Sequence, residues 1–432
     1  MSGKKTGKAR IIMGACAAGL LAAFLVVWGC GGYDQPTVTK TPTALISADT
    51  LKNWADSGLV NGTGFERVVV VEITDNPALY SSGHIPGAVL VNKSEIDQNR
   101  MEGSSLSNSM VADGAHMDAI LQRCGIDRNT TVVFTTSVGK ASYLAARGYF
   151  VFRYWGFPKA RLKVLDGQNA AWLAAYSSLD NSVVNVAPST FSVRDNGGLA
   201  AGVRASLGEM MAAVRAGTAS NAFVDGRGSD NAVGVGTAFS YDGDFRTTAG
   251  VFPAVAGDYV VFEGHMKGAT ALTFSTLFSA GKYLPADNLA ALFAAKGASA
   301  SKTNYVYCRT GYIASALFFA LDGILDWPTQ LYDGSWSQWG QQSTIATAKG
   351  GKLPSATWAT DVPALSELVV YNQDNAATIE AMTVDAIVDT TFTNTSDPAV
   401  NQIEKEDAAY MQQGAGSTGS GGGTGGGAGG GC

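Results

Sequence analysis

The chain has 432 residues, which is long for a single hydrophobic core, so two domains with additional terminal segments are expected. An apolar fraction of 46% and a formal net charge of −6 are typical of a globular protein, and without a basic excess no nucleic-acid partner is expected. Five scattered cysteines and only three histidines argue against a disulfide framework or a structural metal site, so neither a metal nor a cofactor is expected.

Residues 1–29 have the pattern of a secretory signal peptide. A basic opening at residues 4–10 precedes an apolar run over 11–28. The small residue directly before Cys30 resembles the lipobox of bacterial lipoproteins. This resemblance implies that Cys30 is lipidated and holds the exported protein on the bacterial envelope, and Gly31 after it favours the outer membrane. A membrane-spanning anchor is the alternative for this segment.

After a polar linker over residues 30–44, strand-like and helix-like segments alternate. The predicted elements are a buried strand at 67–73, an amphipathic helix at 117–123, a buried strand at 131–135 and a short strand at 164–165. Strands that alternate with helices are typical of a parallel sheet covered on both faces. We therefore predict a first α/β domain over residues 45–182.

Three landmarks of this domain recur later in the chain, in the same order. The sequence GHIPGA at 83–88 returns as GHMKGA at 264–269, the strand at 132–135 returns at 305–307, and LDG at 165–167 returns as YDG at 332–334. An ordered repeat of this kind indicates homologous units. We predict a second α/β domain over 204–345, joined to the first by a linker over 183–203.

The remainder of the chain has no counterpart in the first half. Residues 346–412 contain apolar stretches, so we expect this extension to pack back on the domains or to form a surface for a partner. Residues 413–432 are nearly all small and polar, and such a segment buries too little apolar area to fold. We predict a disordered tail that ends in Cys432.

Together these landmarks resemble the rhodanese family, in particular the tandem thiosulfate and mercaptopyruvate sulfurtransferases. The resemblance rests on GHIPGA, on the signature-like YDGSWSQW at 332–339, on VDGR at 224–227 and on YCRTG at 307–311. It implies two tandem rhodanese-like domains, each a parallel sheet flanked by helices, with the catalytic cysteine in the second alone. Thr136 and its neighbours follow the corresponding strand of the first domain, without a cysteine.

Cys308 is the predicted nucleophile. It follows a buried strand at 304–307 and precedes a predicted helix at 313–321, so backbone N–H groups and the helix dipole are expected to surround its sulfur. Gly311 permits the tight turn. These donors, with Arg309 nearby, are expected to lower the thiol pKa. The thiolate would accept a sulfane sulfur as a persulfide and pass it on.

The resemblance also implies how the substrate binds. Arg227 and Arg309 would hold the anionic donor, while Asp225 would orient the site. The predicted substrate-binding residues are Arg227, Arg309, Thr310, Gly311, Tyr312 and Asp225. Thr310 replaces the lysine of thiosulfate-specific loops, and Arg309 replaces the glycine of mercaptopyruvate-specific loops. Thiosulfate is slightly favoured as the small anionic donor, with cyanide or a thiol as the acceptor.

Other interpretations remain open. Cys308 is alternatively an inert core thiol, and the protein a non-catalytic or redox-accessory lipoprotein that attaches to an envelope protein and handles sulfur, selenium or tellurium oxyanions. A phosphatase is disfavoured because Ala314 stands where its loop needs arginine. Cys124, His84 and His265 are expected to have structural roles.

Overall fold

The computed structural model describes residues 43–103, 105–200, 202–227, 265–339 and 401–413, with the backbone alone of five short strands between residues 345 and 383. The predicted signal peptide, Cys30, the glycine-rich tail after residue 413 and Cys432 lie outside the described residues. All described residues belong to one compact unit, Thr41–Cys432. Within the described ranges, no helix is both long and apolar enough to cross a bilayer.

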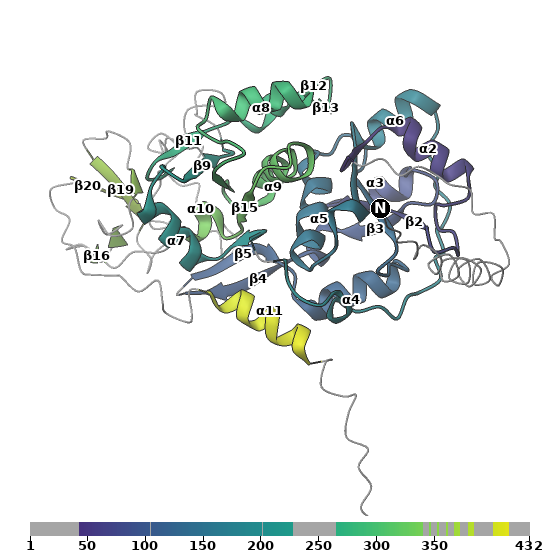
Figure 1. Cartoon of the computed structure of the whole chain (residues 1–432), viewed down its shortest axis with the longest axis horizontal. Helices are drawn as coiled ribbons and strands as arrows, with labels where there is room; N and C mark the ends of the chain where they lie inside the picture. Colours follow the sequence, from purple (N-terminus) through teal and green to yellow (C-terminus); the bar gives the residue numbers. More distant parts are fainter. Residues whose placement is uncertain are drawn as a thin grey trace, which may run out of the picture. The chain divides into compact units, whose positions relative to one another are not determined.

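The first half of the chain forms a five-stranded parallel sheet (Figure 1). Its strand order is β1 (Leu45–Ile46), β7 (Leu162–Leu165), β6 (Thr131–Thr135), β2 (Val68–Thr74) and β3 (Val89–Asn92). Every residue of β2 is buried, as expected for a central strand covered on both faces. The helices are α2 (Ala48–Asp56), α3 (Pro77–Ser82), α4 (Gly114–Arg123), α5 (Tyr143–Tyr154) and α6 (Gln168–Tyr176).

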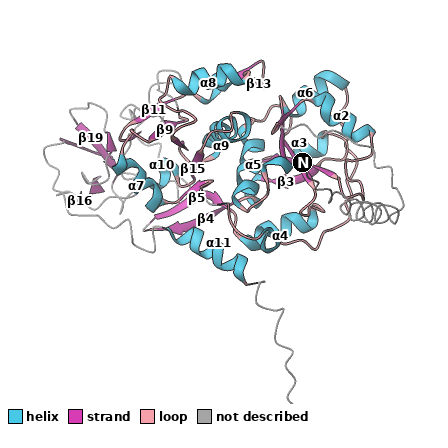
Figure 2. Ribbon diagram, viewed as in Figure 1, coloured by secondary structure: helices cyan, strands magenta, loops and turns pink. Residues whose placement is uncertain are grey.

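The second half forms another five-stranded parallel sheet with the same connectivity (Figure 2). Its strand order is β8 (Arg204–Ala205), β15 (Thr329–Tyr332), β14 (Thr303–Tyr307), β9 (Asn221–Asp225) and β11 (Ala269–Ala271). The helices are α7 (Leu207–Ala216), α8 (Ala286–Ala294), α9 (Tyr312–Phe318), which continues into a π-helical turn at Phe319–Ile324, and α10 (Ser335–Trp339). The predicted fold class, two parallel sheets with helices in tandem, is confirmed.

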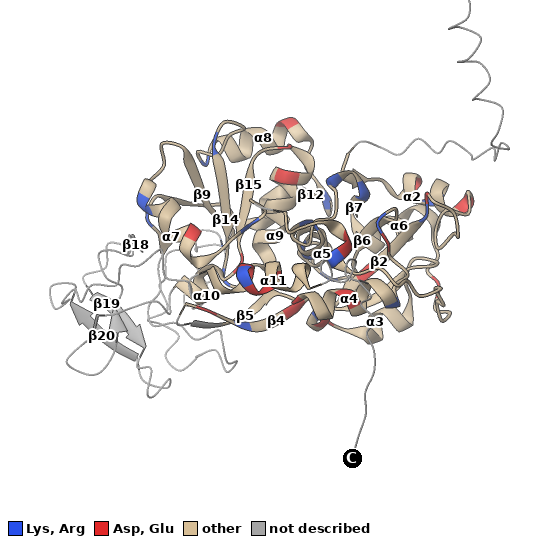
Figure 3. Ribbon diagram, turned by 60° about the horizontal axis from the view of Figure 1, so that its bottom comes forward, with Lys and Arg blue, Asp and Glu red and all other residues tan. Residues whose placement is uncertain are grey.

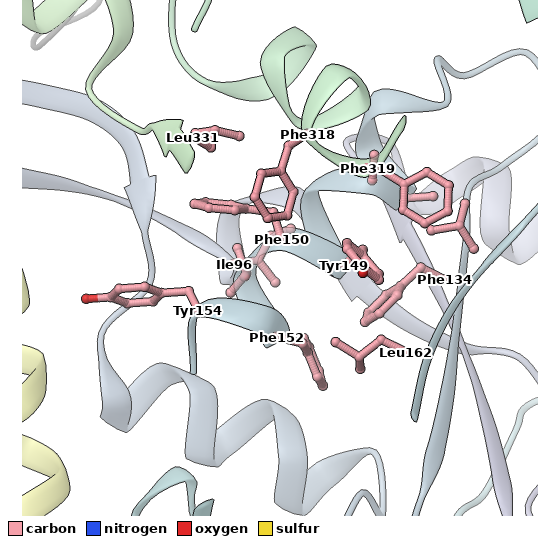
Figure 4. Packing of buried hydrophobic residues seen from close by; sticks show 14 of the residues in the cluster. Ile96, Phe134, Tyr149, Phe150, Phe152, Tyr154, Leu162, Phe318, Phe319 and Leu331 are labelled. Carbon is pink, nitrogen blue, oxygen red and sulfur yellow. The ribbon is translucent and has the colours of Figure 1, made fainter. Parts of the chain in front are cut away.

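Helices α5 and α9 pack against each other and join the two halves into a continuous core. Tyr149 contacts Phe319 edge-to-face at 4.9 Å, and Phe150 contacts Phe318 at 5.3 Å (Figure 4). Edge-to-face aromatic pairs add specific attraction to the burial of apolar area. The helix that follows the Cys308 loop therefore packs directly on the first half of the chain.

Several elements were not predicted, and two of them pack against each other. A hairpin of β4 (Asp97–Glu102) and β5 (Ser105–Val111) interrupts the first half, and its strands are rich in polar residues. Helix α11 (Gln402–Gln412) carries acidic and basic positions beside this hairpin (Figure 3). This helix, the end of the extension, packs on the domains, since buried Asp407 accepts hydrogen bonds from both outer nitrogens of Arg100 at 2.9 Å.

Candidate functional site

The candidate site forms where two neighbouring parallel strands end at the same edge of the second sheet. Asp225 at the end of β9 lies in register with Tyr307 at the end of β14. Cys308 follows directly, and α9 begins at Tyr312. Gly311, with φ of +83°, occupies the left-handed region that the turn requires. The predicted strand, loop and helix unit is present.

The sulfur of Cys308 is surrounded by backbone donors, yet it is deeply buried. The N–H groups of Thr310, Gly311 and Ala314 donate hydrogen bonds to it, whereas Cys308 is only 1% exposed. Burial raises the pKa of the thiol above its ordinary value, and these donors offset the effect only in part. The prediction of a lowered thiol pKa was wrong, because removal of the sulfur from solvent raises the pKa by more than the N–H donors lower it.

The turn between β15 and α10 holds the backbone of the Cys308 loop. The Cys308 N–H donates to Ser335 Oγ at 3.2 Å, and the Cys308 carbonyl accepts from the Trp336 N–H at 3.0 Å. The Ser337 N–H donates to the Arg309 carbonyl at 2.9 Å. Ser335 has φ of +52°, which is uncommon outside glycine. Sequence reasoning missed Ser335, although the YDGSWSQW motif that contains it was the available signal.

Arg227 is buried beside this loop and pairs with Asp225. Its Nε and Nη2 donate to the Asp225 carboxylate, the shortest bond being 2.6 Å, and its guanidinium lies 4.8 Å from the centre of the Trp336 ring. The Trp336 N–H donates a hydrogen bond to the Cys308 carbonyl. The structure therefore brings Arg227, Asp225 and the cysteine loop together. The ion pair fits the predicted role of Asp225 in orienting the site. That role, and the binding of the anionic sulfur donor by Arg227, stay predictions.

The other predicted binding residues lie on the loop but face different surroundings. Arg309 is buried, and Thr310 turns its N–H toward Cys308. Tyr312 instead turns toward the first half of the chain, where its hydroxyl donates to Asp97 at 2.7 Å. The Tyr312 hydroxyl is therefore not expected to contact the sulfur donor, because it already donates its hydrogen bond to Asp97.

A side chain of the first domain packs against the first residue of α9, next to the Cys308 loop. Burial raises the pKa of Tyr143, and the negative charges of Asp75 and ionised Cys308 raise it further. Its ring packs edge-to-face against Tyr312 at 6.1 Å and Phe274 at 5.7 Å. Sequence reasoning missed Tyr143, since nothing in the spacing of the motifs places the start of α5 beside the start of α9.

The remaining candidates have structural surroundings. Burial raises the pKa of Cys124 to about 11, and its N–H caps the end of α4. The His84 ring stacks on Tyr80 at 4.0 Å, and its Nδ1 lies 3.0 Å from the Tyr80 carbonyl. His265 lies in the short strand β10 (His265–Met266). Among the described residues, no cluster of histidine, cysteine and acidic side chains is suited to a metal ion.

Two parallel sheets of one connectivity, with a single cysteine loop on the second, define a tandem protein of the rhodanese fold. A model of the rhodanese-like domain matches residues 47–175. The first half of the chain therefore contains a rhodanese-like domain.

Curated relatives align over about two thirds to three quarters of this chain. The chain is 26% identical over 321 residues to the sulfur carrier protein TtuD of Thermus thermophilus, covering 74% of this chain and 99% of that protein. It is 27% identical over 292 residues to a putative thiosulfate sulfurtransferase, SseA, of Mycobacterium leprae, covering 66% and 87%. The solved structure of the 3-mercaptopyruvate sulfotransferase SseA from Escherichia coli matches with a TM-score of 0.51 and 22% identity, covering 68% of this chain and 99% of that one.

Proposed function

We propose that this rhodanese-type sulfurtransferase moves a sulfane sulfur from thiosulfate, or a similar small anion, to a thiophilic acceptor through a persulfide on Cys308. The observation that carries the proposal is the set of three backbone N–H groups, from Thr310, Gly311 and Ala314, that point at one sulfur atom. Such preorganised donors stabilise negative charge on a reacting atom without reorganisation. The names of the relatives agree with this class of reaction.

The reaction divides into two transfers. The Cys308 thiol loses its proton to solvent, and the thiolate attacks the outer sulfur of thiosulfate. The sulfur–sulfur bond of the donor breaks, sulfite leaves with the electron pair, and Cys308 retains the extra sulfur as a persulfide anion. Cyanide or a thiolate then attacks the terminal sulfur, and Cys308 leaves as a thiolate, which gives ping-pong kinetics.

In this proposal Arg309 and Arg227 supply positive charge for the anionic sulfur donor. Arg309 lies on the loop itself, and Arg227 lies over Trp336 beside it. Charge-assisted hydrogen bonds from guanidinium groups are strong and match the oxygens of a sulfite-like group. Asp225 fixes Arg227 through the buried ion pair and does not react.

The test is sulfur transfer with a matched cysteine control. Purified protein with thiosulfate and cyanide is expected to produce thiocyanate, Cys308→Ser to produce none, and Cys124→Ser to retain turnover, because Cys124 lies in the core of the first half. Mass spectrometry after thiosulfate alone is expected to add one sulfur to the Cys308 peptide. Thiocyanate formation by Cys308→Ser at the wild-type rate would contradict the proposal.

A second candidate is an accessory role in an envelope complex, without turnover. It is favoured by the 1% exposure of Cys308 and the raised pKa of its thiol. If this role is correct, the purified protein produces no thiocyanate and instead co-purifies from membranes with an envelope protein in stoichiometric amount.

We also propose that the protein is exported and anchored by a lipid on Cys30. The basic opening, the apolar run and the small residue before Cys30 support it. Metabolic labelling with a fatty acid is expected to label the wild-type protein and not Cys30→Ser. Labelling of both, or of neither, would contradict the anchor.

A further inference from the structure

Asp333 lies beneath the Cys308 loop and connects it to the first domain. It precedes the turn in which Ser335 and Trp336 bind the backbone of Cys308. Its carboxylate is fully buried, and its Oδ1 accepts a hydrogen bond from Arg147 Nη1 at 2.7 Å. Arg147 belongs to α5, in the half of the chain that has no catalytic cysteine.

Arg147 also lies directly against the loop. A Cβ placed on Gly311 would meet Arg147 Nη1 at 3.1 Å and the Asp333 carbonyl at 3.0 Å. The Arg147 guanidinium lies 5.2 Å from the centre of the Tyr312 ring. Gly311 donates its N–H to the Cys308 sulfur, so Arg147 touches the residue that supplies one of the three donors.

The guanidinium is itself held in one position. Arg147 is completely buried, and its Nη2 donates to the Ser109 carbonyl at 2.6 Å while Nη1 binds Asp333. A planar guanidinium fixed at two ends is a rigid support, whereas a lysine offers one point charge on a flexible stem.

The second half also binds the counterpart of Asp333 in the first half, but through a backbone amide. Asp166 is the first-domain counterpart of Asp333, and it accepts a hydrogen bond from the Tyr283 N–H, not from an arginine. In α9 the residue at the same distance before the aspartate is Ala314. The repeat therefore carries an arginine only where it supports the half that has the cysteine.

We infer that Arg147 is a positioning residue for Cys308: through Asp333 and Gly311 it holds the loop so that its N–H groups converge on the sulfur. The inference rests on the proposed function for its consequence in catalysis, but the geometry of the thiol is measurable without turnover. Without Arg147 the loop N–H groups are expected to be held less firmly around the sulfur. The thiolate is then less stable, and the pKa of Cys308 rises.

The experiment compares Arg147→Gln with Arg153→Gln in the full-length protein. Arg153 is matched, since it lies on the same helix and donates to Asp322 of the second half at 3.2 Å, away from the Cys308 loop. The pH profile of Cys308 alkylation by iodoacetamide, read by mass spectrometry of its peptide, is expected to shift upward by about one pH unit in Arg147→Gln alone, which slows alkylation about tenfold at a fixed pH below the pKa. Arg147→Lys keeps the charge, is expected to give a smaller shift in the same direction, and serves if Arg147→Gln does not fold.

An unchanged profile in Arg147→Gln, or an equal shift in Arg153→Gln, would overturn the inference. With thiosulfate and cyanide, Arg147→Gln is expected to lower kcat and leave KM for thiosulfate near its wild-type value, because Arg147 does not touch the donor. If the wild-type protein shows no turnover, the proposed function fails, and the alkylation profiles still decide the role of Arg147.

Discussion

Cys308 and Cys124 are two equally buried thiols with different neighbouring groups. Each is 1% exposed, and burial raises the pKa of each. Only at Cys308 do three backbone N–H groups act against that rise, whereas Cys124 closes a helix with its own N–H and has the Arg123 charge as its lowering influence. The chemical difference between the two therefore lies in the directed amides and not in exposure.

The raised pKa of Cys308 predicts how its reactivity depends on pH. A thiol with a raised pKa is protonated at neutral pH, so the alkylation rate of the resting protein is expected to climb about tenfold per pH unit and to level off only above pH 9. A cysteine peptide without structure is the control and levels off near pH 9 or below. A plateau of the Cys308 rate below pH 8 would show that the amides outweigh burial.

At the scale of elements, helix α11 holds both halves of the chain. Asp407 binds Arg100 of β4 and accepts a 2.7 Å hydrogen bond from Tyr154 of α5, while Glu404 pairs with Arg204 of β8 at 3.1 Å. Ile403 buries its side chain completely. The helix has a weak apolar face, so buried polar contacts decide where it docks.

Breaking the central ion pair of α11 is expected to destabilise the fold. Asp407→Ala leaves the buried Arg100 guanidinium without its main partner, and loss of one member of a buried pair lowers the free energy of unfolding by about 3–5 kcal/mol. Glu406→Ala is the matched control on the same helix. Its side chain is 51% exposed although it also contacts Arg100, so a change below about 1 kcal/mol is expected. Urea unfolding of both variants measures the difference, and equal losses would contradict the assignment.

Docking of α11 is also expected to depend on pH. Burial raises the pKa of Glu404 to about 7, with Glu209 and Glu102 acting in the same direction against the attraction of Arg204. Because the pKa of Glu404 in the folded state lies above the ordinary 4.5, protonation of Glu404 stabilises the fold. This contribution to the free energy of unfolding is complete below pH 4.5 and is lost as the pH rises to about 7.

The measurement is the free energy of unfolding of wild type and Glu404→Gln at pH 5 and pH 8. Wild type is expected to lose up to about 3 kcal/mol relative to the variant across this interval, since glutamine does not titrate. Glu406→Gln, at an exposed position of the same helix, is the control for the substitution itself. A difference between wild type and Glu404→Gln that does not change with pH would contradict the raised pKa of Glu404.

Element prediction from the sequence succeeded where apolar runs mark buried structure. The strand expected at 67–73 is Val68–Thr74, and the helix expected at 117–123 is the latter part of Gly114–Arg123. The β4–β5 hairpin escaped prediction because its polar strands are stabilised by partners distant in the sequence. Glu102, for example, accepts hydrogen bonds from Arg204 and the Leu207 N–H. No local pattern carries that information.

At the scale of the whole molecule, the two halves share one arrangement of strands, but the loops that follow β6 and β14 differ. Glu72 pairs in register with Thr135, as Asp225 pairs with Tyr307, so Thr136 takes the place of Cys308. The Asn169 N–H approaches the Thr136 carbonyl at 3.4 Å, as the Trp336 N–H binds the Cys308 carbonyl. The repeat made this correspondence predictable, whereas the position of Arg147 beside the second site depends on packing between the halves.

The two loops differ in where the next helix begins. Helix α9 begins four positions after Cys308, and its first turn supplies the Ala314 N–H to the sulfur. Helix α5 begins at Tyr143, seven positions after Thr136. Within the described part of the chain, Thr136 Oγ1 has no hydrogen-bond partner, so no amide converges on it. The longer loop moves the helix start away from the position that a nucleophile would occupy.

Moving the cysteine to the first half is therefore expected not to move the activity. In a Cys308→Thr, Thr136→Cys variant the new thiol has no converging donors, and buried Glu72, bonded to Ser137 at 2.6 Å, disfavours a thiolate nearby. No thiocyanate is expected from thiosulfate and cyanide, and circular dichroism is expected to show the wild-type fold. Turnover by this variant would mean that the shared arrangement of strands alone makes a cysteine reactive. The short loop before α9 would then not be what distinguishes the second half.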